Sequence, residues 1–170
     1  MWPVKGFQYY TNVNYRSCAA CLKLHGRIAW RADRFPDPED GCERAILPFT
    51  WRERKACKEK RRTMKRVAEA ELARRDLFQQ AEAKLADDPD GAVELFRRSA
   101  QIDVYVPEVE ALVERQAAAL RDGDLRERLR LILRQAFSDK FGRRRYERLP
   151  EVMRLEREEA GIRRIDELLG

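Results

Sequence analysis

Residues 18–25 read Cys-Ala-Ala-Cys-Leu-Lys-Leu-His, and a further cysteine, Cys42, follows after a proline-containing loop. This stretch holds three of the four cysteines and the only histidine of the 170-residue chain. Two cysteines separated by two residues can present both sulfur atoms to one ion from a tight turn. His25 and Cys42 could complete the tetrahedral shell with one nitrogen and one sulfur. The spacing therefore predicts a structural zinc site formed by Cys18, Cys21, His25 and Cys42.

The cysteines also allow a different fourth ligand, a redox role or a catalytic zinc site. Cys57 is an alternative fourth ligand, although it lies within a predicted long helix, where we expect a spare thiol. A redox role for Cys18 and Cys21 is less favoured, since no βαβ pattern surrounds them. A catalytic zinc site is less favoured still, because no glutamate or second histidine lies close by as a base.

The first 50 residues are predicted to form a small zinc-knuckle module. Residues 7–13 are rich in strand-forming side chains, and residues 27–30 alternate weakly, so we expect two short strands that flank the cysteine turn. Residues 36–41 contain two prolines and a glycine, which indicates a loop that brings Cys42 toward the turn. So few residues bury little apolar surface, and a bound metal would replace the missing core.

The region from 51 to 170 is predicted to be a helical domain. Thr50-Trp51-Arg52-Glu53 is a capping box, and nothing interrupts a helix from there to about residue 86. Apolar periodicity and breakers predict further helices over 91–102, 107–121, 124–142, 151–160 and 162–169, the last two separated by Gly161. The expected fold class is mainly α: a zinc-stabilised amino-terminal module with short strands, then a long helix and an antiparallel helical assembly.

One helical hairpin, residues 78–102, weakly resembles a tetratricopeptide repeat. No second copy follows at the expected spacing, and such arrays need about three repeats for stability. We therefore expect an ordinary helical hairpin.

Basic side chains are concentrated in the first half of the predicted long helix. Residues 52–66 contain nine lysines and arginines and only two glutamates. One interpretation is a surface that binds nucleic-acid phosphates, and the other is an ordinary solvated helix face. The candidate nucleic-acid-binding residues are Arg52, Lys55, Lys58, Arg62, Lys65 and Arg66.

The sequence favours no enzymatic function. It contains no phosphate-binding glycine loop and no Ser-His-Asp order, and its single histidine is assigned to the metal. Aromatic residues of the first 35 positions are expected to form a small core around the metal rather than a platform for stacking bases; they are Trp2, Phe7, Tyr9, Tyr10, Tyr15, Trp30 and Phe35.

Cysteine usage and hydropathy give an expected location. Four cysteines are too few for a disulfide scaffold, and no amino-terminal apolar run looks like a signal peptide. No apolar stretch approaches the roughly 20 residues that span a bilayer. The sequence therefore predicts a cytoplasmic protein with reduced thiols and without a membrane partner.

Residues 14–26, Asn-Tyr-Arg-Ser-Cys-Ala-Ala-Cys-Leu-Lys-Leu-His-Gly, resemble the cysteine segment of phage Mu F-like minor head proteins, which typically reads D-x-R-T-C-x-x-C-x-x-L-x-G. The resemblance covers residues 14–48. The family's Asp is Asn14 here, its final cysteine is Arg44, and its histidine is Glu39. The resemblance implies a metal-knuckle module of phage or prophage ancestry with a role in particle assembly.

Together these features predict a non-enzymatic structural or interaction protein. The long helix would present a surface to a protein partner or to a second copy of the chain. The alternative is a nucleic-acid-binding protein that uses the basic helix face 52–66.

Overall fold

The computed structural model describes residues 3–14, 16–36, 42–142 and 150–170. The chain divides into two compact units, Met1–Leu72 and Ala73–Gly170. The boundary lies inside the helix α2 (Arg54–Lys84), not at residue 50, where the sequence predicted it. One contact of this part of α2 with the rest of the amino-terminal unit is the hydrogen bond that the Gln8 side chain donates to the Cys57 carbonyl oxygen, at 3.2 Å.

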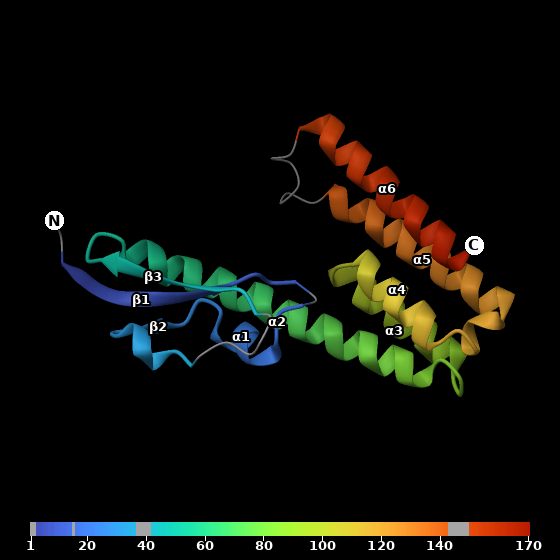
Figure 1. Ribbon diagram of the computed structural model, residues 1–170, viewed down its shortest axis with the longest axis horizontal. Coiled ribbons are helices and arrows are strands. Elements are labelled where there is room, and N and C mark those ends of the chain that lie inside the picture. The colour runs from blue at the N-terminus through green and yellow to red at the C-terminus, as the bar shows by residue number, and fades with distance from the viewer. Residues whose placement is uncertain (1–2, 15, 37–41, 143–149) are drawn as a thin grey trace. The chain divides into compact units, whose positions relative to one another are not determined.

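The amino-terminal unit contains a three-stranded antiparallel sheet with the order β2-β1-β3 (Figure 1). Its strands are β1 (Val4–Thr11), β2 (Ile28–Ala29) and β3 (Arg44–Thr50). The sequence predicted β1 and β2 but not β3. Pro48 is unfavourable inside a sheet, because proline cannot donate a ladder hydrogen bond. The position is tolerated because β3 is an edge strand, where Pro48 pairs with Phe7.

β1 is buried on both faces, and this explains its mixed composition. On one face Tyr9 packs against Cys21 and Phe35. On the other face the buried Gln8 amide donates to the carbonyl oxygens of Gly26 and of Cys57 in α2, at 3.3 and 3.2 Å. β1 thus joins the cysteine-bearing turn on one side to the long helix on the other.

The long helix begins close to the predicted capping box. The Glu53 carboxylate accepts from the Thr50 amide at 2.8 Å and from the Thr50 hydroxyl at 2.9 Å. These two bonds lower the pKa of Glu53. Only half of the predicted reciprocal pattern forms, because the Thr50 hydroxyl donates to Glu53 instead of accepting from its amide.

The carboxy-terminal unit is an antiparallel helical assembly, as the sequence predicted (Figure 1). After the end of α2 it contains α3 (Pro89–Ile102), α4 (Val106–Arg115), the short 3-10 helix η2 (Ala119–Arg121), α5 (Gly123–Phe141) and α6 (Glu151–Leu169). α5 packs against α3 and α6, and α4 packs against α6. The core is apolar, with residues such as Phe96, Leu112, Leu129 and Ile165 almost completely buried.

Two helix boundaries in this unit differ from the prediction. α4 ends at Arg115, not near 121, and a 3-10 turn follows it. α6 is one continuous helix, whereas the sequence predicted a break at Gly161. Gly161 is buried in the helix against the Phe137 ring of α5, so the absence of a side chain serves close packing there.

None of the helices in the described part of the chain is both long enough and apolar enough to cross a membrane.

Candidate metal centre

Cys18 and Cys21 are positioned by the short helix α1 (Ala19–Leu24). Cys18 is its N-cap residue, and the Cys18 sulfur accepts a hydrogen bond from the Cys21 amide at 3.2 Å. A sulfur can replace the usual oxygen cap because it satisfies one of the free amides at a helix start. The two-residue spacing thus places both sulfurs at one end of α1.

Cys42 lies two residues before the first residue of β3 and brings a third sulfur to the same point. The sulfur atoms of Cys18, Cys21 and Cys42 all lie within 4.8 Å of one another, and none is in a disulfide. Sulfurs on a tetrahedral zinc are about 3.8 Å apart for bonds of about 2.3 Å. The three thiols could therefore bind one metal ion after a small contraction.

Hydrogen bonds hold these sulfurs in place. The Cys42 sulfur accepts from the Cys18 amide at 3.4 Å, and the Cys21 sulfur accepts from the Tyr9 hydroxyl at 3.1 Å. Such bonds strengthen when the acceptor is an anion, so they would favour the thiolate form that binds metals. Tyr9 was expected only as a core aromatic residue; the structure adds this contact with a candidate ligand.

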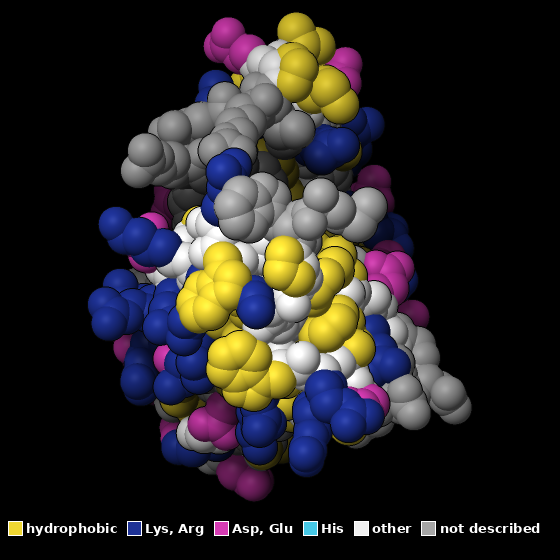
Figure 2. Space-filling model, turned by 90° about the vertical axis from the view of Figure 1, so that its left-hand side faces the viewer, with side chains coloured by type: hydrophobic (Ala, Val, Ile, Leu, Met, Phe, Trp, Pro, Cys, Tyr) yellow, Lys and Arg dark blue, Asp and Glu magenta, His cyan; other side chains and the backbone are white. Residues whose placement is uncertain are grey.

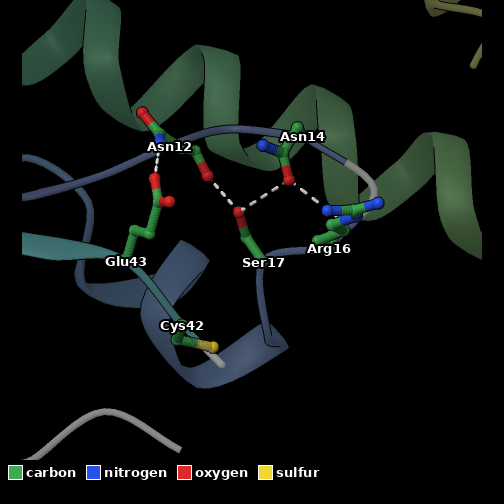
Figure 3. Close-up of a pocket in the computed structure, with 6 residues that line it drawn as sticks. All are labelled: Asn12, Asn14, Arg16, Ser17, Cys42 and Glu43. Carbon is green, nitrogen blue, oxygen red and sulfur yellow. Dashed lines mark hydrogen bonds between the residues drawn. The ribbon is translucent and has the colours of Figure 1, made fainter. Parts of the chain in front are cut away.

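Polar side chains beside Cys42 line a hollow of about 150 Å³ (Figure 3). Asn14 accepts hydrogen bonds from the Arg16 amide at 2.9 Å and from the Ser17 hydroxyl. Asn12 donates to the carboxylate of Glu43, the residue after Cys42. These bonds fix the chain on either side of the cluster, directly before Cys18 and directly after Cys42.

Burial raises the pKa of Cys18 to about 12, and hydrogen bonds with the neighbouring thiols add to the shift. Without a cation this cysteine is therefore a neutral thiol at pH 7. A divalent metal would displace its proton, so metal binding at this site should release protons and weaken in acid.

His25 does not join the three sulfurs. It is the C-cap residue of α1, and its Nδ1 accepts a hydrogen bond from the Thr11 amide at 3.2 Å. Its ring also lies edge-on to that of Tyr10. Burial lowers the pKa of His25, which keeps the imidazole neutral with its proton on Nε2. The predicted histidine ligand instead ties the end of α1 to β1 through its hydrogen bond with the Thr11 amide.

Cys57 also lies apart from the three-cysteine group. It is half-buried in α2, and burial raises the pKa of its thiol. Its backbone carbonyl accepts from Gln8, so its place is in the contact between α2 and the sheet. Among the described residues, the group that could hold a metal ion consists of Cys18, Cys21 and Cys42.

Most of the predicted basic residues share one region of α2. Four of the six line a shallow surface groove together with Glu59 and Thr63: Lys55, Lys58, Arg62 and Arg66. Lys65 pairs with Glu69 at 3.4 Å, and Arg52 is exposed in the turn before the helix.

The predicted aromatic core forms only in part. Tyr9 and Phe35 are buried beside Cys21, and Phe7 packs against them. Trp30 is 72% exposed and is not part of this core. Trp2 and Tyr15 lie outside the described residues.

Comparisons with models of protein families, with curated proteins and with solved structures find no match to this chain. The resemblance of residues 14–48 to phage Mu F-like head proteins thus stays a prediction from the sequence.

Proposed function

We propose that Cys18, Cys21 and Cys42 bind a structural Zn²⁺ and that the protein is a non-enzymatic interaction protein. The observation that carries this proposal is the convergence of three sulfurs within 4.8 Å, from two segments separated by twenty residues. Thiolate-rich sets suit zinc, which cross-links chain segments without redox chemistry. Here the ion would join the start of α1 to the start of β3.

The small core of the amino-terminal unit supports a structural role for the metal. Among its described residues, the core on the sulfur side contains Tyr9, Cys21 and Phe35 as buried residues, and partly buried side chains surround them. A core of this size contributes little stabilisation, so a cross-link at its edge would have a large effect. The stabilised unit would then present the sheet and α2 to a protein partner or to a second copy. Because the cysteine segment resembles one in phage head proteins, we propose that the protein takes part in particle assembly.

Metal analysis of the purified, reduced full-length protein tests the proposal. We expect one zinc per chain in the wild type and a large loss in Cys18→Ser and Cys42→Ser. Cys57→Ser and His25→Ala are the matched controls, and both should retain the metal, because neither side chain joins the three sulfurs. A wild-type protein without metal, with a melting curve that a chelator leaves unchanged, would show that the zinc assignment is wrong.

A second candidate function is nucleic-acid binding by the basic groove of α2. Among the residues that the structure describes, Lys55, Lys58, Arg62 and Arg66 have no carboxylate partner at ion-pair distance, although Glu59 lies in the same groove. Free cations on one helix face suit a phosphate backbone. Binding that weakens steeply from about 50 mM to about 200 mM salt would support this candidate.

A further inference from the structure

Two tryptophans are exposed at one end of the sheet in the amino-terminal unit. Trp30 directly follows β2 and is 72% exposed, and Trp51 directly follows β3 and is 51% exposed. Both strands run antiparallel to β1, which lies between them, so their last residues reach the same end of the sheet. The two tryptophans therefore follow strand ends on either side of the first half of β1, since Ala29 pairs with Phe7 and Thr50 pairs with Val4. Two large exposed aromatic side chains at one end of so small a sheet are unusual for a surface without a ligand.

Cations accompany these indoles. The Lys5 ammonium lies 5.5 Å from the Trp51 ring centre, and the Arg54 guanidinium lies 4.7 Å from it. Val4 at the start of β1 and Leu47 in the middle of β3 are also about half-exposed. Figure 2 shows the result: hydrophobic side chains gather at this end of the sheet, with Lys and Arg among and around them.

The basic groove of α2 extends from this end of the sheet. Arg54, Lys58, Arg62 and Arg66 recur at four-residue spacing, so they lie on one side of the helix, and Lys55 lies beside them. From Arg54 to Arg66 the helix rises about 18 Å. Along the chain, the exposed tryptophans are thus followed by a row of lysines and arginines on α2, within the same amino-terminal unit.

We propose that this surface binds single-stranded nucleic acid, with one or more bases on Trp30 and Trp51 and the backbone phosphates along the α2 groove. The proposal rests on the second candidate function and adds the type of nucleic acid and the residues that contact bases. Exposed aromatic rings beside a positively charged groove are the combination that single-strand-binding proteins use. The bases of a duplex are already stacked on each other, so the indoles would contribute little to its binding.

Titration of the full-length protein into a fluorescein-labelled oligothymidylate, followed by anisotropy at about 50 mM salt, tests the proposal. We expect Trp30→Ala to weaken binding roughly 5- to 150-fold, the range that corresponds to the loss of one base–aromatic stack. Trp30→Phe should retain most of the affinity, because a phenyl ring also stacks. Trp30 is mostly exposed, so neither change should disturb folding. Leu131→Ala is the matched control: it removes an exposed apolar side chain from α5 and should have no effect.

A second pair of variants tests the groove. Arg62→Glu should weaken binding and reduce the dependence on salt, because it removes a phosphate contact. Arg98→Glu changes the net charge equally on the exposed side of α3 and should have little effect.

Several outcomes would overturn the proposal. A duplex bound as tightly as the single strand, or wild-type affinity in Trp30→Ala, would remove the single-strand assignment and leave the second candidate function standing. Absence of binding to both nucleic acids at about 50 mM salt would remove both. Binding to phosphatidylserine vesicles but to neither nucleic acid would assign the surface to an anionic membrane instead.

Discussion

At the scale of single residues, the carboxy-terminal unit depends on a buried cation. Arg74 in α2 is 1% exposed, and its guanidinium makes two hydrogen bonds with the Glu108 carboxylate of α4, at 2.7 and 2.9 Å. The guanidinium also lies 4.9 Å from the Tyr105 ring centre. A buried charge is tolerated only when it is paired, so this contact fixes where α4 can lie against α2.

We therefore expect Glu108→Gln to destabilise the carboxy-terminal unit by about 3 kcal/mol, because it removes the carboxylate charge that accepts two hydrogen bonds from the buried Arg74 guanidinium. The free energy of unfolding in urea, followed by circular dichroism, measures the effect. Glu94→Gln is the matched control: it removes the same charge from a half-exposed pair with Arg97, where solvent screens the interaction, and should cost far less. Equal effects of the two variants would contradict the role assigned to Arg74.

At the scale of helices, α5 and α6 approach each other closely at one glycine. A Cβ atom on Gly161 would lie 2.1 Å from the Phe137 ring, and that ring also packs against Phe141 in the core. The ring cannot move without disturbing α5. Gly161 therefore sets the distance between these two helices.

Gly161→Ala should cost about 1–3 kcal/mol of unfolding free energy through overpacking, although alanine is the better helix former. Gly123→Ala at the start of α5 offers the control, since an added Cβ there meets nothing within 4 Å. That variant should leave the stability unchanged or raise it slightly. Thermal unfolding of both variants distinguishes packing from helix propensity, and stabilisation by Gly161→Ala would contradict the close approach.

At the scale of the whole molecule, the two units are stabilised in different ways. The amino-terminal unit has a small core beside the cysteine cluster, whereas the carboxy-terminal unit has a large apolar core of its own. Removal of the proposed metal should therefore affect mainly the first unit.

Hydrogen exchange of the full-length protein, measured by mass spectrometry with and without a chelator, checks this expectation. Amides of β1 and α1 should exchange roughly tenfold faster or more after chelation, because the cross-link between α1 and β3 is lost. Amides of α3 and α5 should be unaffected. Equal acceleration in both units, or none in the first, would contradict a structural metal that serves the amino-terminal unit.

Local patterns in the sequence determined most of the secondary structure and the position of the cysteine turn. The capping box at Thr50 and the long run without a helix breaker predicted α2, because both signals act within a few residues. The spacing of Cys18 and Cys21 predicted that their sulfurs would meet, since two intervening residues fit the first turn of α1. Glycine and proline marked most of the other helix ends for the same reason.

The tertiary structure decided what depends on distant neighbours. Gly161 has the sequence signature of a break, but the Phe137 ring makes it an internal helix residue. His25 has the spacing of a ligand, yet the Thr11 amide from β1 binds its nitrogen. The sequence predicted Trp30 as a core residue, but it follows the last residue of a two-residue edge strand and is exposed. Spacing along the chain determines which groups can meet locally, whereas packing between distant segments determines which of them do.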